Sequence, residues 1–189
     1  MNMEQTATVE QTEPFEVLVE RHSRGVFRLA YRMTGNEQDA EDVVQETFLR
    51  AYKQLASYDG RAGFQTWVTR IAVNCSIDLL RARNRRGTAV PLDQNFALSS
   101  GEPSPERAAF DGQVRRRLAV AMARLTPVER AAFVLRHYEG AHVDEIARAI
   151  DKPGGATRHC IFRAVQKLRE ALEPVMTGVA PSPSKGMPT

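Results

Sequence analysis

The sequence predicts an all-α protein made of two small helical domains joined by a flexible linker, the second with a helix-turn-helix. Apolar residues recur at steps of three and four along most of the 189 residues, which is the period of an amphipathic helix. Alternating runs of β-branched residues, which mark strands, do not occur. Residues 87–112 lose the helical period and gather Pro, Ser and Gly, as linkers do. A chain of this length can bury two small cores, one on each side of the linker.

Residues 13–90 are predicted to form the first domain, after a disordered segment at residues 1–12. Pro14 suits the first turn of a helix, where a missing N–H costs little. The apolar stripe of this helix stops near Gly35, and Gly25 is a point where the helix would kink or divide.

Two further helices complete the first domain. Asn36 is a candidate N-cap for an acid-rich helix that continues to Leu55. After a Gly-containing turn at residues 57–63, a long helix follows at residues 64–86. One face of this long helix is polar along its whole length. The residues expected to pack inward are Phe64, Trp67, Val68, Ile71, Ala72, Cys75 and Leu79.

The second domain is predicted at residues 107–174, after a linker at residues 91–106. A first helix precedes Thr126-Pro127-Val128-Glu129, a stretch with the form of a capping box and with proline at the first helical position. The helix that it opens is expected to reach Gly140.

Two more helices are predicted to form the helix-turn-helix. Residues 143–150 make a short helix, residues 151–154 break it, and a long last helix follows. Two helices joined by a tight turn at the end of a small bundle are typical of this DNA-binding motif. The tail at residues 175–189 is rich in Pro, Ser and Gly and is predicted to be disordered.

Charged residues are sorted into blocks along the chain. The formal net charge is +3, from 26 basic and 23 acidic residues, a mild bias toward a polyanionic partner. Residues 35–53 hold five acids and two bases, whereas residues 61–86 hold six arginines and one acid. Blocks of opposite charge predict more than one kind of partner surface.

The composition excludes several classes of protein. Cys75 and Cys160 are far apart and lack metal-ligand spacing, which indicates a reducing, cytoplasmic environment. The chain has no run of about 18 apolar residues, and its polar start lacks the apolar segment of a signal peptide, so we expect no direct membrane insertion. None of the four histidines has ligand or nucleophile spacing. We therefore expect no enzyme activity, catalytic residue, metal or cofactor.

Three segments resemble a known family when they are taken in order. They are DAEDVVQETFLRAY, FQTWVTRIAVNCSIDLLR and LTPVERAAFVLRHYEGAHVDEIARAI. The chain resembles the extracytoplasmic-function branch, or group 4, of the bacterial sigma-70 family. The resemblance covers residues 13–90, which match region 2 of the family, and residues 107–174, which match region 4.

The resemblance implies a transcription initiation factor. Such a factor docks on core RNA polymerase, at the β′ clamp coiled-coil and the β subunit, and directs it to promoter DNA. Region 4 recognises the −35 element, and region 2 recognises the −10 element and helps to melt it. The resemblance also implies sequestration by an anti-sigma factor.

An acidic helix face in a net-basic chain is explained by the polymerase partner. In the family this helix lies against the basic β′ coiled-coil, where complementary charge provides orientation and association rate. The alternative is a solvated face with no partner. The residues that match the family motif for core contact are Asp39, Glu41, Asp42, Gln45 and Glu46.

The long helix at residues 64–86 has the side chains needed to capture a single strand. The resemblance implies that Asn74, within IAVN, helps to hold a flipped −10 base; the alternative is a local bond within its helix. Arginines on the same helix fit phosphate contacts, or would form a solvated helix end. They are Arg70, Arg81, Arg83, Arg85 and Arg86. Phe64 and Trp67 have the spacing of core residues rather than of base-stacking ones.

The −35 element is expected to meet the first turns of the last helix, which enter the major groove in this motif. The positions that match the family pattern are Ala156, Thr157, Arg158, His159, Cys160, Phe162 and Arg163. Ala156 replaces a usual threonine and Cys160 a usual arginine. Because a thiol is a weak donor and cannot neutralise a phosphate, we expect fewer ionic contacts here than in most relatives.

Two other functions remain open at the level of sequence. An autonomous helix-turn-helix regulator would use the second domain in the same way, but would bind duplex DNA as a dimer and leave the acidic helix unexplained. An anti-sigma or adaptor protein would leave the arginine-lined helix unexplained.

Overall fold

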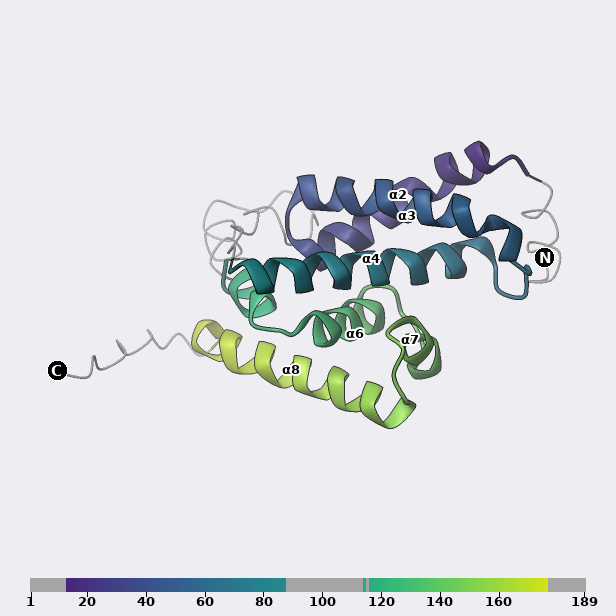
Figure 1. The fold of residues 1–189 in the computed structure, drawn as a ribbon. Coiled ribbons are helices and arrows are strands. Elements are labelled where there is room, and N and C mark those ends of the chain that lie inside the picture. The colour runs from purple at the N-terminus through teal and green to yellow at the C-terminus, as the bar shows by residue number, and fades with distance from the viewer. Residues whose placement is uncertain (1–12, 88–113, 115, 177–189) are drawn as a thin grey trace, which may run out of the picture.

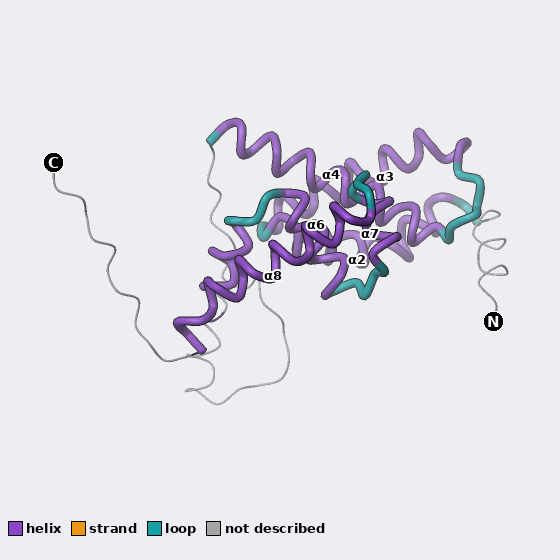
Figure 2. The backbone as a smooth tube through the Cα atoms, turned by 90° about the horizontal axis from the view of Figure 1, so that it is seen from below, coloured by secondary structure: helices purple, strands orange, loops and turns teal. Residues whose placement is uncertain are grey.

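The computed structural model describes residues 13–87, 114 and 116–176, and within these ranges all regular structure is helical (Figures 1 and 2). The predicted N-terminal disorder at residues 1–12, the linker at 91–106 and the tail from residue 177 lie outside the described residues. The helices of the first domain are α2 (Phe15–Thr34), α3 (Glu37–Gln54), the 3-10 turn η1 (Leu55–Ser57) and α4 (Phe64–Arg86). Those of the second are a helical segment at residues 116–123, α6 (Pro127–His137), α7 (Val143–Ala149) and α8 (Gly154–Met176).

Local sequence explains where the first helices begin and end. Pro14 occupies the N-cap of α2, and Gly35 ends α2 with a left-handed φ of 72°, which glycine adopts without strain. α2 is one uninterrupted helix through Gly25. The predicted N-cap of α3 is confirmed, because the Asn36 side chain accepts a hydrogen bond from the Asp39 backbone N–H at 3.0 Å.

α4 is the central helix of the molecule. α2 and α3 pack on one side of it, and α6 and α7 pack on the other (Figure 1). Successive residues of its middle, such as Ile71, Ala72 and Val73, are therefore all buried, although they point in different directions. The inward face differs from the prediction near its end, where Leu80 is buried and Leu79 is only partly buried.

The second domain contains the predicted helix-turn-helix. The capping box that opens α6 is present, since Thr126 accepts from the Glu129 N–H and Glu129 accepts from the Thr126 N–H. α6 ends at His137, three residues before the predicted Gly140. A tight turn after α7, with Asp151 at a φ of 51°, leads into α8. α8 continues to Met176.

Candidate functional site

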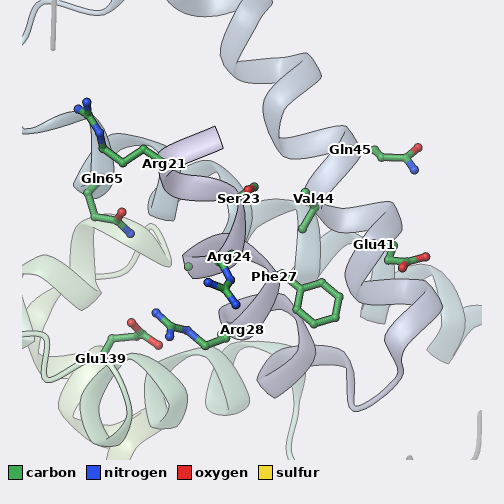
Figure 3. Close-up of a pocket in the computed structure, with 11 residues that line it drawn as sticks. Arg21, Ser23, Arg24, Phe27, Arg28, Glu41, Val44, Gln45, Gln65 and Glu139 are labelled. Atoms are coloured by element: carbon green, nitrogen blue, oxygen red, sulfur yellow. The ribbon is translucent and has the colours of Figure 1, made fainter. Parts of the chain in front are cut away.

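The acidic face of α3 is open to solvent over part of its predicted extent. Glu41, Asp42 and Gln45 are exposed, and Figure 3 shows Glu41 and Gln45 pointing away from the arginines of α2. Three side chains on adjacent turns thus form a negative and hydrogen-bonding strip, named here the α3 strip. Such a strip suits a basic protein surface.

Asp39 does not share this surface. Asp39 is only 6% exposed, and its side chain forms an ion pair with Arg83 of α4. Burial raises the pKa of Asp39, against the lowering effect of the Arg83 guanidinium. Asp39 and Arg83 were predicted to contact polymerase and DNA, respectively, but in this structure they neutralise each other and join α3 to α4.

Glu46 lies at the edge of the α3 strip and is also engaged. Its carboxylate accepts from Arg50 Nε at 2.6 Å, and Arg50 Nη1 lies 3.3 Å from Asp78 Oδ2 on α4. The bond from Glu46 raises the pKa of Arg50, which is therefore fixed as a cation between two acids. Glu46 contributes charge to the strip but is less free than its neighbours.

Asn74 lies at a small pocket on the polar face of α4. The pocket has a volume of about 320 Å³ and is lined by both α3 and α4. Asn74 is half-buried, and Gln54, Arg70 and Trp67 contribute to the same walls. Side-chain amides and a guanidinium around a recess can hydrogen-bond the edge of an unpaired base.

The aromatic residues of α4 have the structural role that their spacing predicted. Phe64 is fully buried, and Trp67 stacks on Tyr58 with ring centroids 4.8 Å apart. Trp67 is nevertheless only partly buried, so one part of its ring borders the pocket. Of the predicted phosphate contacts on α4, those exposed to solvent are Arg70, Arg81, Arg85 and Arg86.

The first turns of α8 present a basic face with one aromatic residue. The exposed side chains among those predicted to contact the −35 element are Ala156, Arg158, His159, Phe162 and Arg163. Phe162 is 65% exposed, which is unusual for a large apolar residue and fits a contact with a partner.

Two predicted −35 contacts point into the domain instead. Thr157 is fully buried and its hydroxyl donates to the Pro153 carbonyl at 3.1 Å, which anchors the start of α8. Cys160, one turn further on, is buried with it. Because the apolar stripe of α8 includes both positions, neither side chain reaches the exposed basic face.

The comparisons with known proteins agree with the two-domain arrangement. Residues 18–86 match the family model of sigma-70 region 2, and residues 121–170 match that of sigma-70 region 4. The RNA polymerase sigma-H factor of Pseudomonas aeruginosa is 32% identical over 86% of this chain and 88% of its own length. The chain belongs to the sigma-70 family.

Other relatives place it within the extracytoplasmic-function (ECF) group. The ECF sigma factor SigE of Mycolicibacterium smegmatis is 37% identical over 84% of this chain, which spans only 61% of that relative. The ECF sigma-E factor of Escherichia coli is 34% identical over 86% of this chain and 88% of its own. The chain is thus an ECF sigma factor, a transcription initiation factor that directs RNA polymerase to promoters.

Solved structures show the same fold at low sequence identity. The sigma factor RpoE of Bartonella quintana, solved with the anti-sigma factor NepR, superposes with a TM-score of 0.65 at 19% identity, over 84% of this chain and 96% of its own. CnrH, solved with the cytosolic domain of CnrY, superposes with a TM-score of 0.60 at 24% identity, over 90% of this chain and 96% of its own. Among the described residues of this sigma factor, no helix is long and apolar enough to span a bilayer.

Sequence reasoning missed the role of Glu129 beyond capping α6. Glu129 is only 2% exposed, and its carboxylate lies 2.7 Å from Lys167 Nζ and 3.4 Å from Arg163 Nε, both on α8. Burial alone would raise its pKa, but bonds from Lys167 and Thr126 outweigh burial and lower it. Glu129 therefore joins α6 to α8 and holds one of the exposed arginines. The sequence shows that Arg163 and Lys167 are four residues apart and so lie on one face of a helix. It does not show that both contact Glu129, which is distant in the sequence.

Glu129→Gln should destabilise this sigma factor by about 1–2 kcal/mol at pH 7, because it weakens a helix cap and leaves Lys167 without its anion. Since the folded-state pKa of Glu129 is lowered, its stabilising effect is present above about pH 4.5, the unfolded value, and is lost as the pH falls through the folded value. Urea unfolding should therefore show a difference in the free energy of unfolding between the parent chain and Glu129→Gln that is smaller at pH 3.5 than at pH 7. Glu170→Gln, an exposed change on α8, is the control; a gap independent of pH would contradict this role.

Proposed function

We propose that this sigma factor binds core RNA polymerase through the α3 strip, reads and opens the −10 element with α4, and reads the −35 element with α8. The predicted boundaries of region 2, at residues 13–90, and of region 4, at residues 107–174, are part of the proposal. The observation that carries it is the separation of exposed charge: acids on α3, and arginines on α4 and on the first turns of α8.

The polymerase side of the proposal rests on the exposed residues of the strip. Glu41, Asp42 and Gln45 are the predicted core contacts with free side chains, and Glu46 adds charge at the edge. The partner is the basic β′ clamp coiled-coil, with the β subunit contacting other parts of the factor. Opposite charges there would orient the complex and speed association.

The DNA side uses two different kinds of recognition. Around Asn74, the recess on α4 suits a base that has left the stack, a state that costs a few kcal/mol and must be compensated by hydrogen bonds. On α8, Arg158 and Arg163 suit base edges or phosphates in the major groove. The exposed arginines at the end of α4 add affinity that carries no sequence information.

The sigma factor acts by binding, without catalysis, cofactor or metal of its own, and it works in the cytoplasm, where the polymerase is. An anti-sigma factor is a further partner. This expectation is supported by the solved structure of RpoE from Bartonella quintana, which was crystallised with the anti-sigma factor NepR. An autonomous DNA-binding regulator is not favoured, because it would need no acidic strip.

Run-off transcription with purified core polymerase tests the proposed function directly. The sigma factor and core are incubated with a library of randomised −35 and −10 sequences, and the enriched templates are sequenced. Discrete start sites that require both proteins are expected. DNA binding that is tight and specific without core would instead identify the autonomous regulator.

Asn74→Ala should reduce open-complex formation by about 10- to 100-fold, because a base-specific hydrogen bond is worth about 1–3 kcal/mol. Potassium permanganate footprinting of unpaired thymines measures this step. Copurification with core should not change, since Asn74 is on α4 and not in the α3 strip. Asn84→Ala, an exposed asparagine about three turns further along α4, serves as the matched control. An equal loss in both variants would remove the special role of Asn74.

A further inference from the structure

A large open hollow beside α2 is not used by the contacts proposed above. It has a volume of about 1230 Å³ and is lined by residues of α2, α3 and the start of α4. Three arginines of α2 line it at steps of three and four residues, so they share one side of the helix. They are Arg21, Arg24 and Arg28. Figure 3 shows Arg24 and Arg28 extending from α2 into this space.

The acids that border the hollow do not cancel its positive charge. Glu139 is already paired with Arg32, whose Nη1 lies 2.8 Å from Glu139 Oε1. Glu41 is exposed and points away from the arginines of α2 (Figure 3). Arg21 is held by Glu13, with Nη1 and Oε2 2.6 Å apart. The available positive charge of the hollow therefore comes from the other two arginines.

Arg24 and Arg28 lie beside an aromatic ring. Both arginines are exposed, and neither forms an ion pair within the described residues. Phe27 is partly buried and lines the same hollow. Cations next to an aromatic ring bind single-stranded nucleic acid, because the cations contact phosphates while an unpaired base stacks on the ring. An acidic peptide would use the arginines but not the ring.

Gly25 leaves the backbone of α2 open to the hollow. It lies inside the helix, where glycine is less stable than alanine. Packing does not require it, because a Cβ at this position would meet Gln65 Nε2 at 3.6 Å, an ordinary contact distance. The glycine thus keeps space free beside Arg24 and Arg28 at a cost in helix stability, which fits a site that a ligand approaches closely.

Shared walls connect the hollow with the recess at Asn74. Gln65 lines the hollow and also a cleft of about 360 Å³ that α4 borders on one side. Trp67 and Arg70 line both this cleft and the recess. Gln65 and Asn74 are nine residues apart on α4, or about 14 Å. This is the length of about four stacked nucleotides at 3.4 Å each.

The direction of α4 places the hollow downstream of the −10 base. α4 ends at Arg86, before the linker that leads to region 4 and so to the upstream −35 element. The start of α4, where Gln65 lies, then faces the downstream side, on which the melted strand continues toward the start site.

We propose that Arg24, Arg28 and Phe27 form a strand site, which binds the unpaired promoter strand about four nucleotides downstream of the base at Asn74. The arginines contact phosphates, and Phe27 stacks on a base. This inference rests on the proposed function, because it requires the −10 strand to lie on α4.

Binding of forked promoter DNA by the sigma factor assembled with core polymerase tests the strand site. A short fork carries the −35 and −10 elements, and its single strand ends with the −10 element. A long fork extends the same strand by about eight nucleotides, twice the spacing from Asn74. Fluorescence anisotropy gives the dissociation constant of each fork. The parent sigma factor should bind the long fork more tightly than the short one.

Arg24→Ala with Arg28→Ala should weaken binding of the long fork by about 10-fold at about 0.1 M salt and leave the short fork unchanged. The salt slope for the long fork should fall by about 1.4, since each phosphate contact to a single strand contributes about 0.7. Arg124→Ala with Arg169→Ala, which removes two exposed arginines of region 4, is the control of equal charge and should keep the advantage of the long fork.

Phe27→Leu separates stacking from charge. It should weaken the long fork by about five-fold, the low end for one stacked base. A long fork whose extension has no bases should bind this variant and the parent equally, because only the phosphates remain.

Three results would overturn the strand site. They are an advantage of the long fork that persists without Arg24 and Arg28, equal weakening of both forks, and loss of copurification with core, which would assign the hollow to an acidic protein surface. The proposed function can be judged separately. If the parent binds neither fork in a manner that depends on the −10 sequence, the proposed function fails. If it recognises the −10 element in the short fork but gains nothing from the extension, only the strand site fails.

Discussion

Glu41→Lys with Asp42→Lys should abolish copurification of the sigma factor with core RNA polymerase. Both side chains are exposed and lie on the α3 strip, so the change places two positive charges opposite a basic partner. Like charges across an interface cost several kcal/mol, and we expect affinity to fall at least about 100-fold. Affinity capture of tagged core, followed by quantitative immunoblotting, measures the loss.

The fold should survive this change, because exposed substitutions usually alter stability by about 0.5 kcal/mol or less. A thermal melt checks that expectation. Glu16→Lys with Glu20→Lys is the matched control: both residues are exposed on α2, and the net charge changes by the same amount. Retained copurification in the α3 variant, or an equal loss in the α2 control, would show that the α3 strip is not the contact.

The helical elements could be predicted because their signals are local. The Asn36 cap, the Thr126–Glu129 capping box and the apolar period of α4 each involve residues within one or two turns. The errors at element ends have local causes as well. The apolar pattern allows α6 to continue past His137, but the backbone turns there and brings Gly140 to a φ of 68°. A pattern of apolar positions does not fix the residue at which a helix stops.

The composition of the surfaces could be predicted only in part, because it depends on contacts between distant residues. Asp39 and Arg83 are 44 positions apart, and each lies in a segment rich in residues of its own charge, which predicts an exposed side chain. Only the packing of α3 on α4 brings them together. The acids that remain available, Glu41 and Asp42, carry the same sequence signal as Asp39, so the sequence could not separate them.

On α8 too, the sequence could not show which of the predicted contact residues are exposed. A family pattern lists consecutive positions as contacts, whereas a helix presents only some of them on one face. Thr157 and Cys160 are three residues apart and lie on the buried side. Arg158 and Phe162 are four apart and lie on the exposed side. The replacement of the usual arginine by Cys160 therefore removes a charge from a position that, in this chain, helps to pack the domain.

Arg158→Ala with Arg163→Ala should lower transcription from −35-dependent templates by about 100-fold. Each arginine that contacts a base edge or phosphate contributes about 1–3 kcal/mol, and the two lie more than one turn apart on the exposed face of α8. If both contact phosphates, the salt dependence of promoter binding should also weaken, by about one unit of slope for each residue. Run-off transcription across a series of salt concentrations measures both quantities.

Two comparisons separate recognition from folding in this experiment. Arg124→Ala with Arg169→Ala removes two exposed arginines of region 4 outside the proposed contact and should leave the −35 dependence intact. Cys160→Ser changes a buried side chain, so it should lower the melting temperature without changing which −35 sequences are preferred. A changed −35 preference in Cys160→Ser, together with normal activity of the Arg158 and Arg163 variant, would place the recognition face on the opposite side of α8. Loss of copurification with core in the arginine variant would instead assign these residues to the polymerase interface.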